Sequence, residues 1–188
     1  GSRDIQRGVE YCSSICCMIA VKQARLALAL PSTAPECHIF HMDMRTFGKG
    51  YQRYKDEART EGVAFHRVRI HSVEPEAGSG RLRLRFPDQD GHLQEESFDL
   101  VVLSTGARPA EGTGRLSSML DLETNEWGFP MAGPLSPSLT SREGVTLSGA
   151  FSGPRDISES VLTAGSASLE ASRVLHASGG GLAVEETE

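Results

Sequence analysis

Three of the four cysteines in this chain lie within six residues, at positions 12, 16 and 17. They stand at the start of a run whose apolar spacing predicts a helix from about Cys12 to Leu30, ending before Pro31. Because helical positions four apart share a face, Cys12 and Cys16 are expected one turn apart, with Cys17 about 100° further round. Thiolates gathered in this way are the ligands that iron–sulfur clusters and other soft-metal sites use.

Other interpretations of the same cysteines remain open. Free cysteine is often a small buried hydrophobe, and a helix rich in alanine and isoleucine could bury all three. A disulfide is poorly placed, because adjacent or one-turn helical cysteines rarely meet the required Cβ geometry. Three thiolates are also one fewer than a structural zinc site or a cluster takes. The spacing alone favours neither the metal or redox role nor the structural role.

The composition limits the class of protein. With 188 residues, 38% apolar and 23% charged, the chain suits one globular domain or two small ones. A net charge of −6 argues against nucleic-acid binding. No apolar run reaches the ~20 residues of a membrane helix, so no direct membrane insertion is expected. The N-terminus lacks the apolar core of a secretory signal, and clustered cysteines do not form a disulfide framework, so we expect a reducing, cytoplasmic location.

Helix and strand patterns follow one another as in α/β proteins. Strands are expected at 37–43, 63–73, 81–86, 98–104 and 144–149, and further helices at 48–61, at 116–120 and from about 158 to 176. Arg81, Arg83 and Arg85 alternate with apolar residues, which predicts a half-exposed strand with its arginines toward solvent. The fold class is therefore α/β, in three layers with a β-meander. A parallel sheet normally opens with a strand, whereas this chain opens with a loop and a helix, so the sequence looks cut.

Two strand-to-glycine junctions give a second signal. The predicted strands at 98–104 and 144–149 lead into Gly106 and Gly149, and glycine at such a strand end lets the backbone approach a phosphate or a ring. A helix N-terminus, which favours anions, follows the second junction. Asp156 stands just before that helix. It could cap the helix or contact a cofactor, and the sequence leaves both roles open.

Three blocks of sequence carry a family resemblance. They are Gly1–Asp4 with Tyr11–Met18, Ala20, Lys22, Gln23 and Ala24; Asp43–Tyr51; and Gly149–Ile157 with Glu159 and Ser160. Together they resemble the A subunit of heterodisulfide reductase, over nearly the whole chain. The cysteine block is the most specific part of this resemblance.

The resemblance implies an iron–sulfur flavoprotein with a thioredoxin-reductase-like nucleotide-binding fold, present here in part. A four-iron, four-sulfur (4Fe–4S) cluster would be bound by Cys12, Cys16 and Cys17, with a fourth cysteine upstream of this chain. The glycine fingerprint for FAD would also lie upstream. Cys37 matches no ligand and is expected in the core. The implied partners are other subunits of a reductase complex and electron carriers.

Two departures from the superfamily pattern bear on the cofactors. Gly1–Asp4 occupies the turn where a reductase-type domain would carry Gly-x-Gly-x-x-Gly for pyrophosphate, so we infer that a cluster replaced NAD(P) there. Asp43, at the end of the next predicted strand, would hold the ribose in an NAD domain and could here be only structural. Gly149 is followed by alanine, where the superfamily commonly has an aspartate that reaches the FAD ribityl chain. We therefore expect Asp156 or the backbone near Ile157, together with Gly106 and Gly149, to contact FAD.

The sequence thus predicts an oxidoreductase subunit that passes electrons between FAD and iron–sulfur clusters, with no side chain acting as acid, base or nucleophile. Residues 1–110 would form the NAD-domain-like, cysteine-bearing part, 111–178 a return segment of the FAD domain, and 179–188 a disordered tail. The stretch alone is expected to be inactive. The alternatives are a pyridine nucleotide–disulfide oxidoreductase and a cofactor-free or zinc-binding docking module.

Overall fold

The computed structural model describes residue 3 and residues 10–31, 35–88 and 90–177, and these form two compact units. The first unit comprises the described residues up to Gly106, and the second runs from Ala107 to residue 177. Both helices and strands are present, so the expectation of a mixed α/β protein is confirmed. The expected disordered tail lies outside the described residues.

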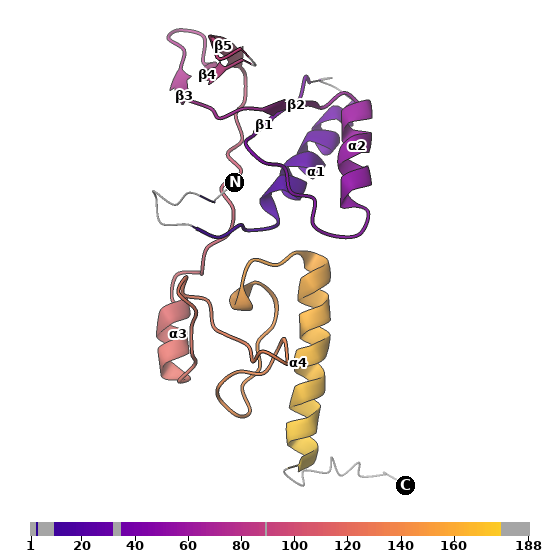
Figure 1. The fold of residues 1–188 in the computed structure, drawn as a ribbon, viewed down its shortest axis with the longest axis vertical. Coiled ribbons are helices and arrows are strands. Elements are labelled where there is room, and N and C mark those ends of the chain that lie inside the picture. The colour runs from indigo at the N-terminus through magenta and orange to yellow at the C-terminus, as the bar shows by residue number, and fades with distance from the viewer. Residues whose placement is uncertain (1–2, 4–9, 32–34, 89, 178–188) are drawn as a thin grey trace. The chain divides into compact units, whose positions relative to one another are not determined.

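The first unit contains a parallel strand pair joined by a helix. The chain runs through α1 (Cys16–Leu28), β1 (His38–His41), α2 (Tyr51–Thr60) and β2 (Ala64–Arg67). Strands β1 and β2 are parallel, in the register His38 to Ala64 and His41 to Arg67. Figure 1 shows α1 and α2 side by side. This β–α–β arrangement places the end of β1 close to the start of α1, where the cysteines lie.

A small apolar core joins the two helices to the strands. Val21 of α1, Ala58 of α2 and Val63 before β2 are at most 2% exposed and pack together. Cys37 is among the partly buried residues against this core, where burial raises the pKa of its thiol. Arg25 of α1 reinforces the packing, because its guanidinium lies over the Tyr54 ring. The same guanidinium forms ion pairs with Glu57 of α2 and with Glu61, the C-cap residue of that helix.

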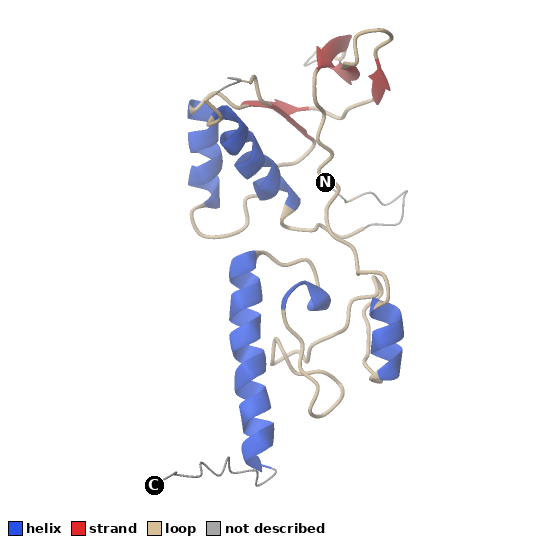
Figure 2. Cartoon of the chain, turned by 180° about the vertical axis from the view of Figure 1, so that it is seen from behind, coloured by secondary structure: helices blue, strands red, loops and turns tan. Residues whose placement is uncertain are grey.

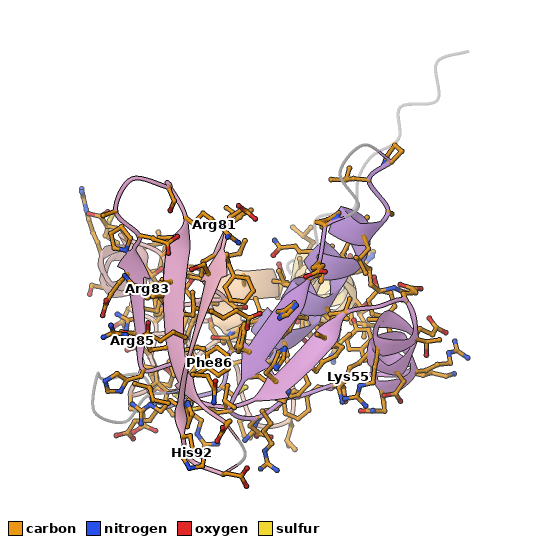
Figure 3. The ribbon with its side chains drawn as sticks, turned by 90° about the horizontal axis from the view of Figure 1, so that it is seen from above. Lys55, Arg81, Arg83, Arg85, Phe86 and His92 are labelled. Carbon is orange, nitrogen blue, oxygen red and sulfur yellow. The ribbon has the colours of Figure 1, made fainter. Side chains whose placement is uncertain are left out.

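An antiparallel meander follows, formed by β3 (Ser72–Pro75), β4 (Leu82–Pro87) and β5 (Leu93–Phe98) in that order. The strands are labelled in Figure 1 and drawn in red in Figure 2. The predicted single strand at 63–73 is therefore wrong, because β2 and β3 are separate strands in different sheets. The pattern predicted for β4 is confirmed, with Leu84 and Phe86 buried. The three arginines do not point into solvent alone (Figure 3). Arg81, just before β4, pairs with Asp99, and Arg83 and Arg85 of β4 pair with Glu95 and, for Arg85, also with Glu74.

The predicted buried strand at 98–104 is also wrong. Only Phe98 lies in a strand, and Leu100, Val102 and Leu103 are 65% to 77% exposed. An apolar run forms a buried strand only where neighbouring strands accept its hydrogen bonds and cover its faces. In the described part of the chain this run has no such strand neighbour.

The second unit is organised around α4 (Ile157–Ala177), with α3 (Thr113–Met119) and the 3-10 turn η2 (Gly149–Ser152) as its other helical elements. The predicted strand at 144–149 is instead an isolated bridge between Leu139 and Thr146, although Leu147 is buried. Hydrogen bonds tie these loops to α4: the Ser138 hydroxyl donates to the Thr163 carbonyl at 3.1 Å, and the Gly149 amide donates to the Thr163 hydroxyl at 3.0 Å.

Among the described helices, none combines the length and the apolar character that a membrane span requires.

A cluster of aromatic rings connects the two sheets of the first unit. The His66 ring stacks on Phe40 at 4.7 Å and on His38 at 5.1 Å, and Phe40 contacts Phe86 and Phe98 of the meander. His66 Nε2 and His38 Nδ1 are buried without a hydrogen-bond partner among the described residues. Burial, followed by the neighbouring charge of His38, lowers the pKa of His66, while Glu96 opposes this.

We therefore predict that the first unit loses stability as the pH falls below the ordinary histidine pKa of about 6.5. A depressed pKa in the folded state means that the unfolded chain binds protons more readily, so acid favours unfolding. Urea unfolding at about pH 7.5 and about pH 5 can be followed by tyrosine absorbance, since all three tyrosines lie at positions 11, 51 and 54.

The substitution His66→Phe keeps an aromatic ring and removes the titration, so it should reduce this pH dependence. His92→Gln is the control, since the His92 side chain is 78% exposed. An unchanged pH dependence in His66→Phe would contradict the prediction.

Candidate metal centre

The cysteines gather around the start of α1, but they do not share a helix face. The helix begins at Cys16, so Cys12 lies in the preceding loop and the predicted helical stacking of Cys12 on Cys16 is wrong. The reason is the backbone at Ser14, whose φ of 62° is left-handed and incompatible with a continuous helix. The loop turns there, and the Ile15 amide donates to the Ser13 carbonyl at 2.7 Å.

The three thiols differ in exposure and in their partners. Cys16 is buried at 6% exposure, whereas Cys12 and Cys17 are half-buried. The Ser14 amide donates to Cys12 Sγ at 3.4 Å, and the Cys17 thiol donates to the Asp43 carbonyl at 3.9 Å. All four cysteines of the chain are free thiols in the structure.

Cys16 and Cys17 hold their protons unequally. A hydrogen bond from Cys17 is the largest influence on Cys16 and lowers its pKa to about 6, against the effect of burial. The pKa of Cys17 is raised, first by the same bond and then by burial, while the Arg45 backbone amide acts in the opposite direction. The hydrogen bond between the two thiols thus favours the thiolate form of Cys16, and the thiolate is the form that binds metal.

Segments distant in sequence fix the walls of this site. The Ser104 hydroxyl donates to the Cys16 carbonyl at 3.0 Å across 88 positions of sequence. The loop after β1 brings Asp43 and Arg45 beside Cys17, and the Arg45 guanidinium bonds to the Asp43 carboxylate at 2.9 Å. Neither Ser104 nor Arg45 was predicted as a site residue, since no local pattern relates either residue to the cysteines.

The spacing of the sulfurs can be compared with the spacing that zinc sites and iron–sulfur clusters require. Zinc binds thiolates at about 2.3 Å, which brings its ligand sulfurs within roughly 4 Å of one another. Among the described residues, the three cysteines do not form a group whose ligand atoms all lie within 4.8 Å of one another. In a cluster each thiolate binds a different iron, so the sulfurs lie further apart. The three thiols thus lack the spacing of a preformed zinc site, while the hydrogen bond between Cys16 and Cys17 keeps two of the sulfurs closer together than a cluster would. The spacing therefore favours neither group, and either one requires a further ligand.

Among the described residues, one group of side chains does bring its potential ligand atoms within 4.8 Å of one another. It comprises Asp88, Asp90 and His92 at the turn between β4 and β5. There the Asp88 carboxylate accepts hydrogen bonds from the amides of Asp90 and His92 and from the Gln94 side chain, at 2.8–2.9 Å. The Gln94 bond, followed by the His92 amide, lowers the pKa of Asp88. These bonds give the group a role in holding the turn.

The residues predicted to contact FAD lie in both units. Gly106, with φ of 85°, ends the exposed segment that follows β5. Gly149, Asp156 and Ile157 lie in the second unit at the approach to α4. The φ of Gly149 is 60°, a conformation that strongly favours glycine, and its amide is already bonded to Thr163.

Asp156 has a structural role in a capping box. Its carboxylate accepts the Glu159 amide at 2.7 Å, and the Glu159 carboxylate accepts the Asp156 amide at 2.9 Å. This reciprocal pair satisfies two backbone donors at the start of α4, just before Ile157. The capping role that the sequence left open is therefore present, whereas FAD contact stays a prediction.

Replacing Asp156 by alanine should destabilise the second unit by about 1 kcal/mol, because the Glu159 amide loses its acceptor. Asp156→Asn keeps a side-chain oxygen for the cap and should cost much less. The single tryptophan, Trp127, lies in this unit, so its fluorescence during urea unfolding reports the effect. Equal stability of Asp156→Ala and the parent would contradict the capping role.

The fold is that of a mixed α/β protein, and three free thiols gather at the start of its first helix. No protein-family model matches the chain. It is 40% identical to the iron–sulfur A subunit of CoB–CoM heterodisulfide reductase from Methanocaldococcus jannaschii, across 87% of this chain and 25% of that protein. It is 37% identical to a protein of the same description from Methanopyrus kandleri, across 98% of this chain and 28% of that protein.

A third relative is the A subunit of a ferredoxin/F(420)H(2)-dependent CoB–CoM heterodisulfide reductase from Methanosarcina acetivorans, which is 36% identical across 86% of this chain and 20% of its own length. The chain thus spans about a quarter of the length of the curated relatives that it matches. Over that span the chain is similar to the A subunits of heterodisulfide reductases, and the resemblance found in the sequence is confirmed.

Proposed function

We propose that this chain is the cluster-bearing part of an electron-transfer flavoprotein of the heterodisulfide reductase A type. The observation that carries the proposal is the gathering of three free thiols, Cys12, Cys16 and Cys17, at the start of α1. The names of the relatives, which describe reductase subunits and in part iron–sulfur subunits, support the same function.

The three cysteines would supply three of the four thiolates of a 4Fe–4S cluster, with the fourth from a segment that precedes this chain in the longer protein. Such a cluster supplies one-electron transfer when bound. The protein's own residues hold and orient the ligands. Burial keeps water from Cys16, the Ser14 amide stabilises negative charge on Cys12, and Ser104 fixes the first turn of α1.

A thioredoxin-reductase-like fold fits the order of elements. The β1–α2–β2 unit followed by the β3–β5 meander is what the NAD-domain-like part of such a fold would contain. The cysteine loop then stands where the phosphate-binding turn of a nucleotide domain would lie. In this proposal residues 1–110 belong to that part, and 111–178 return to the FAD domain.

FAD would be bound in the longer protein, with Gly106, Gly149, Asp156 and Ile157 among its contacts. The start of α4 supports this, because a helix N-terminus presents backbone amides to an anion. The left-handed glycines support it too, because glycine lets the backbone approach a phosphate or a ring. The capping box already uses two of these amides, so the backbone at Ile157 is the stronger candidate.

The whole protein would pass electrons between FAD and iron–sulfur clusters, within an oxidoreductase complex of the cytoplasm. Its partners would be other subunits of that complex and electron carriers, and the chain alone would be inactive. The proposal requires no general acid, general base or nucleophile among the residues of this chain, because electron transfer depends on cofactor position and potential.

The test uses a polypeptide extended upstream to the length of the relatives, purified without oxygen. We expect about four irons and as many acid-labile sulfides to be lost on replacing Cys16 by serine, because serine is a poor ligand for iron. Cys37→Ser is the matched control and should keep its iron, since Cys37 packs against the core. Zinc, or no metal in the parent protein, would instead favour the docking module.

A further inference from the structure

The loop that follows β1 places a pair of opposite charges beside one of the thiols. The Cys17 thiol donates to the backbone carbonyl of Asp43 at 3.9 Å, so this loop forms one wall of the site. Two residues further on, the Arg45 guanidinium bonds to the Asp43 carboxylate at 2.9 Å. The Asp43 backbone connects the ion pair to the Cys17 thiol. Both charged side chains belong to residues at most two positions in sequence from that contact.

Neighbouring contacts restrict the position of the Arg45 charge. The Arg45 side chain is 33% exposed, compared with 62% for Asp43, and its guanidinium lies 5.9 Å from the centre of the Phe47 ring. The Arg67 side chain donates to the Met42 carbonyl at 3.3 Å and so ties the end of β1 to β2. A charge held in a fixed place can act on a redox group, whereas a freely moving side chain is screened by solvent.

Reduction of an iron–sulfur cluster adds one electron, and therefore one negative charge, to the site. A nearby positive charge stabilises the reduced form and raises the reduction potential, and a nearby negative charge has the opposite effect. In the Asp43–Arg45 pair the two charges largely cancel. Each charge offsets the effect on the reduction potential that the other charge would have alone.

We propose that Asp43 and Arg45 are positioning residues that set the reduction potential of the group bound by Cys12, Cys16 and Cys17. The proposal rests on the function proposed above and goes beyond it by assigning the tuning to this loop. The pair acts through its two charges and through the hydrogen bond from the Cys17 thiol to the Asp43 carbonyl. Neither side chain binds the metal.

Two substitutions of nearly unchanged size should shift the potential in opposite directions. Asp43→Asn removes the negative partner, leaves the Arg45 charge uncompensated, and should shift the midpoint potential upward. Arg45→Gln leaves the Asp43 carboxylate uncompensated and should shift the potential downward. The double variant, which carries both substitutions, should lie near the parent protein.

The experiment is an anaerobic redox titration of the extended polypeptide, followed by electron paramagnetic resonance of the reduced cluster, with iron content measured for every variant. Arg45→Lys keeps the charge and should stay near the parent potential. The double substitution Arg83→Gln with Glu95→Gln is the matched control, because it removes the ion pairs of Glu95 with Arg83 and Arg85 between β4 and β5 and leaves the net charge unchanged. It should leave the potential unchanged.

A purely structural ion pair would give a different result. Breaking it from either side would shift the potential in the same direction, lower the iron content, or change nothing, and each of these outcomes overturns the proposal. If the parent binds no iron, the proposed function fails; if it binds iron and the two single variants do not shift oppositely, only the inference about Asp43 and Arg45 fails.

Discussion

The left-handed turn at Ser14 is the constraint on which the site depends. A helix continuing back through Cys12 would stack that cysteine on Cys16 and fan the three thiols along one helical surface. The turn instead places Cys12 in a loop, directs the Ser14 amide at its sulfur, and leaves Cys16 as the first helical residue. The rest of the first unit serves to hold that helix start in place. Val21 anchors α1 in the core, Arg25 clamps it to α2, and Ser104 holds its first turn.

The same arrangement explains why the end of β1 matters. In open α/β sheets, functional groups gather at the carboxyl ends of strands, because the loops there are free to vary while the strands are fixed. Here Asp43 and Arg45 follow β1 directly and meet the cysteine loop, and β1 itself is held by its parallel pairing with β2 and by the rings of His38 and Phe40. The aromatic cluster and the thiol site are therefore supported by the same short strand.

Much of this structure could be predicted from the sequence, and the errors have identifiable physical causes. Helix α2, strand β4 and helix α4 could be located from their residue patterns. Strand β4 buries Leu84 and Phe86, as its alternation predicts, whereas α2 buries Ala58 and α4 buries Thr163. The start of α1 does not follow, since a serine in a left-handed conformation has no sequence signal comparable to that of glycine. The runs at 98–104 and 144–149 have the apolar content of buried strands, but a strand also needs neighbours, and a single segment carries no information about them.

For the site, the cysteines could be found from their type and spacing, and Asp43 from its place after a strand. Ser104 and Arg45 could not, because their role comes from tertiary contacts. Asp156 illustrates the opposite case. The pattern of aspartate followed three residues later by glutamate predicts a helix cap without any structure, and the reciprocal bonds with Glu159 are present.

The exposed side chains of Leu100, Val102 and Leu103 have a practical consequence for handling the chain by itself. Three large exposed apolar residues within four positions, outside the strands of the described chain, favour strand pairing between molecules. Sedimentation and light scattering of the isolated chain should therefore depend on its concentration. Physical measurements on it would then report self-association together with folding, unless the chain is kept dilute.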